Sequence, residues 1–349
     1  MSSANTSENV RRKLDHIHAA LHEDVEFHSR TAGFERYALV YEALPEISRS
    51  DVDTSTVLFG KRLSMPLIIS AITGGTDEAR KYNLLLAEAA QHFGIAMGVG
   101  SQRVALEDPT LADTFQVRDI APDILLFANL GAVQLNNGCG IESCEKAIEM
   151  IDADGLMLHL NPLQESAQSN GNTNFGHLAA RIEEVCEAIE APVVVKEVGH
   201  GISARTARLL LNAGVDGIDV AGAGGTSWAK VESRRETDTR MAALGLALGE
   251  WGIPTVDSLL AVRSVTPHLP VIASGGVRSG EDIAKAIALG AEAVGMALPL
   301  LRAAAESREA LFARIEQLMD ELATVMFCTG MRTIQDLMDS SSLAESRKV

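Results

Sequence analysis

Four polar side chains follow a single apolar run near the middle of the chain. The segment HLNPLQE at residues 159–165 comes directly after GLML and carries His159, Asn161, Gln164 and Glu165. It places an amide beside a carboxylate and contains no serine or cysteine, so it does not indicate side-chain nucleophilic catalysis. His159 is compatible with a satisfied core histidine and with a residue facing a substrate, and the sequence leaves both readings open.

Five further polar residues close apolar runs in the same way, namely Thr73, Ser101, Asn129, Lys196 and Thr226. Lys196 follows three valines, where a charge is a poor core residue and needs a partner or a ligand. Ordinary capping explains any one of these residues, but the five together favour a flat polar heterocycle that carries a phosphate. FMN fits, because Asn and Thr can bond to the ring edge and Lys can stabilise a reduced, anionic flavin near N1.

A glycine pair marks a candidate phosphate site. Gly275 and Gly276 lie in ASGGVRSGED, after the seventh apolar run, and GMALPLL forms the eighth. Glycines permit close approach of backbone N–H groups, and the helix expected to begin near Ser279 would point its positive end toward the loop. A tight turn without a ligand is the alternative. The strand context and the paired GMA segment favour phosphate.

The N-terminal segment RRKLDHIH supplies a second candidate anion site. It places Arg11, Arg12 and Lys13 together in an otherwise acidic chain, and Arg103 beside Ser101 is a natural partner. A solvated charged face is the alternative. The nearby histidines do not have the spacing of a standard zinc site; they are His16, His18 and His22.

Composition excludes several classes of function. The chain has 349 residues, 46% of them hydrophobic and 4% aromatic, with a net charge of −17. This charge argues against nucleic-acid partners and against docking on an anionic membrane, although local Lys and Arg can still bind anionic small molecules. The four cysteines form no CxxC motif, and we find no apolar leader or membrane-spanning run. We therefore expect a soluble cytoplasmic protein with reduced thiols.

Eight short apolar runs alternate with amphipathic or alanine-rich segments from residue 61 onward. The runs lie at 65–70, 95–100, 124–131, 155–161, 192–199, 217–225, 270–277 and 293–300. Helices are expected between them, at 77–92, 141–151, 177–189, 203–213, 238–250 and 281–289 among others, with a final amphipathic helix at 304–326. This alternation is typical of an α/β protein with a (β/α)8 TIM barrel.

The pattern divides the chain into two parts. Residues 1–60 form an N-terminal extension with the candidate anion-binding Arg and Lys, and residues 61–349 form the barrel with its C-terminal helix. Residues 10–60 show no strong periodicity. Within the barrel, the segment around Ser203 aligns at a constant offset with that around Ser279, which predicts two equivalent helix N-caps.

Taken together, the motifs resemble the type 2 isopentenyl-diphosphate delta-isomerases, which are FMN- and Mg²⁺-dependent barrel enzymes. The motifs are RKLDHI, AITGG, GVGSQR, ANLG, HLNPLQE, KEVGHGIS, GGTSW, ASGGVRSGEDIAKAIALGA and GMALPLLR, and they span about residues 10–340. The resemblance implies FMN contacts at Ala71, Ile72, Thr73, Ser101, Asn129, Lys196, Thr226, Gly275, Gly276, Val277, Ala297 and Leu298. It implies substrate contacts at Arg12, Lys13, Ser101, Gln102, Arg103, His159 and Gln164. His200 departs from the pattern, in which a smaller or apolar residue is expected.

The implied reaction moves a double bond of isopentenyl diphosphate to give dimethylallyl diphosphate. Reduced FMN would act as acid and base through N5, with NADPH or another donor to reduce it. Gln164 would be the catalytic residue that positions the substrate, and Glu165 would hold Mg²⁺ on the diphosphate. The resemblance also implies a homo-oligomer, a tetramer or larger.

Two rival functions remain at this stage. The first is an FMN-dependent hydroxyacid oxidoreductase of the same barrel class, which would use a histidine base near the flavin; the sixth run ends in VAGAGGTSW without one. The second is a non-catalytic FMN- or isoprenoid-binding protein. The intact Gln164–Glu165 pair and the cations Arg12, Lys13 and Arg103 argue against it.

Overall fold

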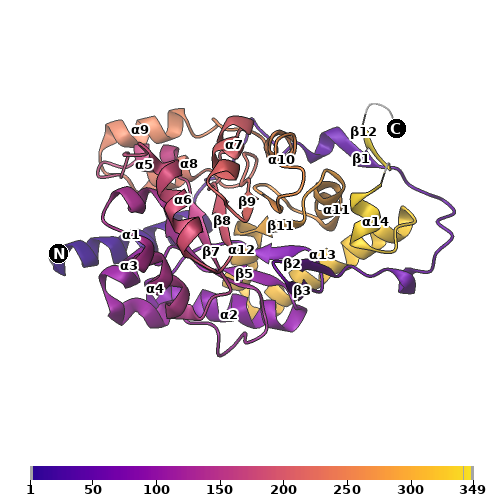
Figure 1. Ribbon diagram of the computed structural model, residues 1–349, viewed down its shortest axis with the longest axis horizontal. Helices are drawn as coiled ribbons and strands as arrows, with labels where there is room; N and C mark the ends of the chain where they lie inside the picture. Colours follow the sequence, from indigo (N-terminus) through magenta and orange to yellow (C-terminus); the bar gives the residue numbers. More distant parts are fainter. Residues whose placement is uncertain (1–2, 341, 347–349) are drawn as a thin grey trace.

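The computed structural model describes residues 3–340 and 342–346, and of residues 3–10 the backbone alone. Eight parallel strands close into a barrel in the order β10–β11–β4–β5–β6–β7–β8–β9 (Figure 1). Their bounds are β4 Leu67–Ile69, β5 Ala96–Gly98, β6 Leu126–Gly131, β7 Gly155–His159, β8 Val193–Lys196, β9 Gly217–Asp219, β10 Val271–Ser274 and β11 Ala293–Met296. All eight lie within the predicted apolar runs, and the (β/α)8 barrel is confirmed.

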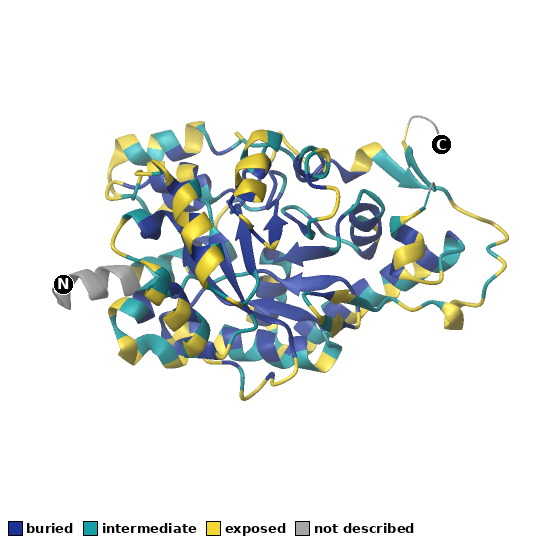
Figure 2. Ribbon diagram, in the orientation of Figure 1, coloured by how far each residue is buried: buried dark blue, intermediate teal, exposed yellow. Residues whose placement is uncertain are grey.

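Helices cover the outside of the barrel, with their outer faces exposed and the strands buried (Figure 2). The longer ones are α2 Asp77–Phe93, α4 Ile141–Ile151, α6 Leu178–Ala188, α7 Ala204–Asn212, α8 Trp228–Arg235, α9 Thr239–Ala247, α10 Thr255–Arg263 and α11 Gly280–Ala288. The Oγ atoms of Ser203 and Ser279 accept hydrogen bonds from Thr206 N and Asp282 N, so both predicted N-caps are confirmed.

The predicted final helix at 304–326 is two helices, α12 Leu298–Glu306 and α13 Arg308–Cys328. Ser307 separates them because it is fully extended and its side chain caps α13 by accepting from Ala310 N. The predicted inner face of α13 is confirmed, since Leu311, Ile315 and Leu322 are fully buried. The single-helix expectation was wrong because an N-capping serine does not interrupt an apolar pattern.

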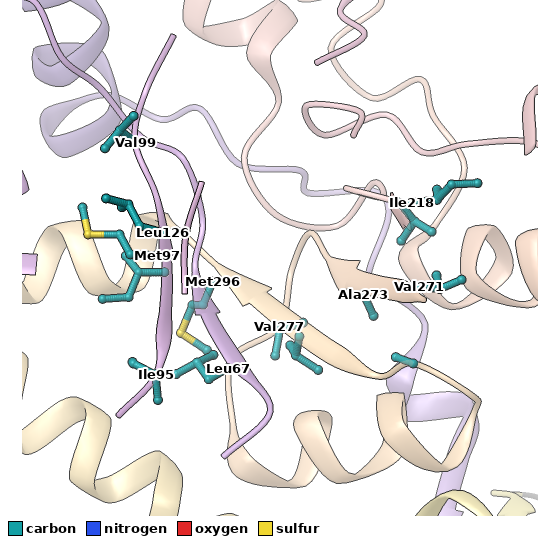
Figure 3. Close-up of a cluster of buried hydrophobic side chains, with 14 of the residues drawn as sticks. Leu67, Ile95, Met97, Val99, Leu126, Ile218, Val271, Ala273, Val277 and Met296 are labelled. Carbon is teal, nitrogen blue, oxygen red and sulfur yellow. The ribbon is translucent and has the colours of Figure 1, made fainter. Parts of the chain in front are cut away.

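Two groups of core side chains fill the barrel layers. Figure 3 shows part of the layer between strands and helices, which includes Leu67, Met97, Leu126, Val271 and Met296. The interior of the barrel is a separate cluster, formed by Ile68, Ala96, Phe127, Met157, Val194, Ile272 and Ala293.

A hairpin plugs the amino-terminal end of the barrel. Strands β2 Thr56–Leu58 and β3 Lys61–Leu63 pair antiparallel, and Leu58 and Leu63 pack into the interior cluster. Phe59 and Gly60 form the turn, both with positive φ, and the Phe59 ring meets that of Phe127 edge-on at 5.8 Å. The hairpin spans residue 60, the predicted boundary, and leaves the carboxyl end of the barrel as the open end.

Most of the remaining elements lie at the two ends of the molecule. Helix α1 Ser3–His22 packs on α8, although no helix was expected from the pattern of residues 10–60. Strand β1 Tyr37–Leu39 pairs with β12 Leu343–Glu345 beside α14 Ile334–Met338, which brings the two parts of the chain together (Figure 1). The short helices are α3 Arg103–Glu107, α5 Pro162–Ser166 and the 3-10 turns at Phe34–Arg36, Arg49–Asp51, Pro109–Thr114 and Ala132–Asn136. No helix among the described residues has the length and apolar character needed to span a membrane.

Candidate active site

Two adjoining cavities open at the carboxyl end of the barrel. The reaction cavity is lined by side chains from α1, α3 and α5 and by the ends of β6, β7 and β8. The glycine-loop cavity lies between the ends of β8, β9, β10 and β11. They share the walls formed by Ala71, Ile72, Lys196, Val198 and Trp228, so they form one continuous site.

Every residue for which the resemblance implies an FMN contact lines one of these two cavities. The reaction cavity takes Ala71, Ile72, Thr73, Ser101, Asn129 and Lys196, and the glycine-loop cavity takes Thr226, Gly275, Gly276, Val277, Ala297 and Leu298. The reaction cavity is also lined by Arg12, Lys13, Arg103, His159, Gln164 and Glu165. The structure therefore brings these residues together, while their roles stay predictions.

Gln102 is the exception. Its side chain is fully buried behind the cavity wall: Nε2 donates to Ala147 O at 2.8 Å, and Oε1 accepts from Asn129 N at 2.9 Å. Both ends of the amide are used to join α4 to β6. The structure thus places the Gln102 side chain behind the wall, in a supporting position, and a substrate contact of this residue stays a prediction.

Helix α1 forms one wall of both cavities. Arg12, Lys13 and His16 face the reaction cavity, and Ala20 faces the glycine-loop cavity. At this spacing the four residues lie on one side of the helix. The chain after α1 is held by backbone hydrogen bonds, from Phe27 N to Gly225 O at 2.9 Å and from Ser227 N to Val25 O at 2.8 Å.

Three cations, Arg12, Lys13 and Arg103, meet at the mouth of the reaction cavity, and of the three only Arg103 forms an ion pair within the described part of the chain. Lys13 Nζ lies 3.4 Å from Ser101 O, Arg103 Nε donates to Glu107 at 2.8 Å, and Arg12 Nη1 donates to Gln168 at 3.2 Å. Burial, followed by the charges of Arg12 and Arg103, lowers the pKa of Lys13 to about 7. Such a cluster is poised to take a strongly charged anion.

The segment 161–165 folds into a network of amides and carboxylates. Pro162 begins the short helix α5, which turns Gln164 and Glu165 toward the cavity. Asn161 Nδ2 donates to Gln164 Oε1 at 3.0 Å and to Glu165 Oε1 at 2.9 Å, and Asn172 N donates to Glu165 Oε2 at 2.6 Å. Asn161 Oδ1 is buried and has no hydrogen-bond partner among the described residues.

Glu232 of α8 completes this network, and the sequence analysis missed it. Its side chain is fully buried and accepts from Gln164 Nε2 and from Arg235 Nη1, both at 2.8 Å, with His16 Nε2 at 2.9 Å. Burial opposes ionisation, but His16, Arg235 and Gln164 together lower the pKa of Glu232 to about 2. The sequence feature that could have identified Glu232 is its position one helical turn after Trp228, on the helix that follows GGTS.

His159 is a neutral polar group that faces the cavity. Its Nδ1 lies 2.8 Å from Asn129 Oδ1, so the ring donates from Nδ1 and leaves Nε2 as an acceptor. Burial, then Lys196 and Lys13, lower the pKa of His159 to about 3. The open choice between a core and a cavity-facing histidine is settled in favour of the cavity wall.

Lys196 ends β8 at the junction of the two cavities. Its Nζ donates to Glu197 O at 2.5 Å and is close to the buried Asp219. The Glu197 carboxylate accepts hydrogen bonds from several backbone N–H groups, including those of Val198 and Gly199, both at 2.7 Å. These bonds fix the loop that follows Lys196. His200 is held apart from the cavities, with Nδ1 2.6 Å from Trp251 O.

The glycine-loop cavity has walls of bare backbone. Gly275 and Gly276 have φ of +101° and +75°, and a Cβ at Gly276 would lie 2.5 Å from Gly224 O. A Cβ at Gly225 would lie 2.5 Å from Gly276 N. Only glycines allow these loops to approach so closely, which leaves backbone groups accessible at the cavity.

The helix that points into this cavity is α12 rather than the predicted α11. Ser279 and Asp282 cap α11, and Gly280 N donates to Glu321, so its first N–H groups are already bonded. Ala297 and Leu298, at the start of α12, line the cavity, and Ala297 provides no side-chain cap. Of α11 and α12, it is therefore α12 whose N-terminus lines the cavity and could meet a phosphate.

Comparison with known proteins decides the family. Residues 7–116 and 144–344 match the family described as FMN-dependent dehydrogenase. The isopentenyl-diphosphate delta-isomerase of Nostoc sp. is 51% identical over 342 residues, which cover 98% of both chains. That of Rickettsia peacockii is 47% identical over 328 residues, covering 94% of this chain and 96% of its own.

The chain belongs to the FMN-dependent dehydrogenase family and, within it, to the isopentenyl-diphosphate delta-isomerases. Solved structures agree on the fold. A lactate oxidase of Pediococcus acidilactici superposes with a TM-score of 0.67 at 17% identity, covering 98% of this chain and 94% of its own. A mandelate oxidase mutant with an FMN adduct gives 0.64 at 20% identity, covering 90% and 89%. At these identities the likeness concerns the barrel, not the reaction.

Proposed function

We propose that this isomerase interconverts isopentenyl diphosphate and dimethylallyl diphosphate by a 1,3-allylic proton shift, with reduced FMN and Mg²⁺. The observation that carries the proposal is the continuous site, in which a cation cluster, an amide–carboxylate network and a glycine-walled cavity meet around Lys196. The activity in the names of relatives about 50% identical supports the same reaction.

The glycine-loop cavity has the features that FMN needs. Gly225, Gly275 and Gly276 and the uncapped start of α12 would hold the phosphate. Thr73 Oγ1, which is buried without a partner among the described residues, and Lys196 are available to the ring system. When bound and reduced, FMN would supply an acid/base group beside the substrate double bond, and we propose NADPH as its reductant.

The side chains of this chain would bind and orient the substrate. Arg12, Lys13 and Arg103 would take the diphosphate. Gln164 would lie beside the reacting carbons as a neutral group, held by Glu232 on one side and Asn161 on the other. The wall formed by α1 and Trp228 would exclude water, which an alkene protonation through a tertiary cation requires.

A magnesium ion at Glu165 is compatible with the donor set. No group of three or more His, Cys, Asp or Glu side chains in the described part of the chain could hold a metal ion by itself. Glu165 and the unpartnered Asn161 Oδ1 offer hard oxygen ligands, so water and diphosphate oxygens would complete the coordination.

The test is anaerobic turnover of isopentenyl diphosphate by protein loaded with Mg²⁺ and FMN reduced by dithionite, with dimethylallyl diphosphate measured by NMR. Product should appear only with reduced flavin. Gln164→Ala should lower kcat by about 100-fold or more without changing flavin absorbance, and Gln335→Ala, on exposed α14, should match the wild type. A reduced, magnesium-loaded wild type that forms no product would refute the proposal.

A further inference from the structure

A third cavity adjoins the reaction cavity on the solvent side. Its lining consists entirely of polar and charged residues, namely Arg11, Arg12, Asp15, Arg103, Gln168, Ser169, Asn170, Asn172, Arg235, Glu236 and Thr237. We call it the arginine cavity. It shares Arg12, Arg103 and Gln168 with the reaction cavity, so the two are in direct communication.

The charge of the arginine cavity is opposite to that of the chain. Four arginines face two carboxylates, in a protein of net charge −17. The Glu236 carboxylate is turned to the backbone, where it accepts from Ser169 N and Thr237 N at 2.9 Å each. The Nε atoms of Arg12 and Arg235 are buried and lack hydrogen-bond partners in the described part of the chain. Arg103 and Arg235 also pair with carboxylates outside this lining, Glu107 and Glu232. The lining itself has two more arginines than carboxylates, which favours an anion.

The lining also restricts what kind of anion fits. It has no aromatic or aliphatic side chain on which a base or a prenyl chain would pack. Of the cations proposed for the substrate diphosphate, Lys13 lines the reaction cavity alone, whereas Arg12 and Arg103 line both cavities. Arg11 and Arg235 line the arginine cavity and not the reaction cavity. The arginine cavity is therefore suited to phosphate groups of a longer ligand that enters the reaction cavity.

The reductant is such a ligand. The reaction and glycine-loop cavities share one wall, so a molecule that reaches the flavin site through the mouth passes the arginines. We infer that the arginine cavity binds phosphate groups of NADPH while the nicotinamide occupies the reaction cavity, an inference that rests on the proposed function. Reductant and substrate would then use the same mouth and exclude one another.

Equilibrium binding tests this without turnover. Isothermal titration of FMN-loaded, oxidised protein with NADP⁺, NAD⁺ and inorganic pyrophosphate should give tighter binding of NADP⁺ than of NAD⁺. Arg11→Gln and Asn170→Glu each alter the charge of the lining at an exposed position. Each should weaken NADP⁺ binding about tenfold, the effect of about 1.4 kcal/mol, and should weaken pyrophosphate binding clearly less, because Lys13 lies outside the arginine cavity. Arg205→Gln, on the exposed face of α7, is the matched control.

Three results would overturn the inference. One is unchanged NADP⁺ binding in both variants, and another is equal affinity of the wild type for NADP⁺ and NAD⁺. The third is a parallel loss of pyrophosphate affinity, because the arginine cavity would then be part of the diphosphate site. Turnover with dithionite-reduced FMN needs no nucleotide, so its failure would count against the proposed function alone.

Discussion

Binding of a diphosphate is expected to add a proton to Lys13. Burial and the neighbouring charges of Arg12 and Arg103 lower the pKa of this lysine to about 7. A bound dianion or trianion replaces the lost hydration and opposes both arginines, so the pKa should return toward the ordinary value of 10.5. Ligand binding and proton binding are therefore linked at this residue.

The size of the effect follows from these two pKa values. A lysine with a pKa of about 7 is about half protonated at pH 7 and about one-tenth protonated at pH 8. If anion binding returned the pKa of Lys13 fully to its ordinary value, the protein would take up roughly 0.5 proton at pH 7 and roughly 0.9 proton at pH 8. Such a change in pKa corresponds to about 5 kcal/mol of coupling between anion binding and protonation of Lys13. Between the free and the bound pKa of Lys13, anion affinity should fall as the pH rises.

Calorimetric titration with pyrophosphate in two buffers of different ionisation enthalpy measures the proton uptake. Pyrophosphate itself titrates in this range, so the control is Lys13→Arg, which keeps the charge and has no titration near pH 8. The difference between wild type and variant isolates Lys13 and should approach one proton at pH 8. Equal uptake by the two proteins would show that Lys13 is already charged in the free protein, and the reasoning about the cation cluster would be wrong.

Three further substitutions test other parts of the site and fold. Gly276→Ala places a Cβ 2.5 Å from Gly224 O at a φ of +75°, so FMN affinity measured by fluorescence should fall at least about tenfold, with a lower Tm. The pKa of Glu232, about 2 against an ordinary 4.5, means that its carboxylate stabilises the fold above pH 4.5 and loses that effect as pH falls toward 2. Between pH 4.5 and pH 2, the wild type should therefore lose about 3 kcal/mol more of its free energy of unfolding than Glu232→Gln does, as measured by urea unfolding. Ser307→Ala removes the N-cap of α13 and should cost about 1 kcal/mol in the same assay.

The barrel could be predicted because its strands leave a simple trace in the sequence. Parallel strands buried on both faces form continuous apolar runs, and β8, with Val193–Lys196 inside the run at 192–199, is one example. The polar residues at the strand ends were equally visible, since a lysine after three valines has no place in a core. Their convergence on one site then follows from the topology alone.

The parts that were missed share a different cause. Helix α1 lacks a clear apolar stripe because its inner face carries Arg12, Lys13 and His16, which line the reaction cavity. Polar residues therefore occupy positions at which apolar residues would have revealed an amphipathic helix. Glu232 looks like any surface glutamate in a charged helix until the fold buries it. Gln102 is the reverse case, since its motif neighbours line the cavity while its own side chain points behind the wall, which the sequence does not reveal.

Helix α1 also joins the reaction cavity to the glycine-loop cavity, because its side chains line both. Ile17 and Ala19 of α1 are buried, while its Arg12 and Lys13 lie close to Arg103, so three like charges repel one another at the reaction cavity. The segment after it is tied to the glycine loop through Val25 and Phe27 and, by the Glu26 carboxylate, to Arg278 and Arg302. A bound diphosphate would offset this repulsion, and the proposed substrate contacts of Arg12 and Lys13 would then also hold α1 against the cavity.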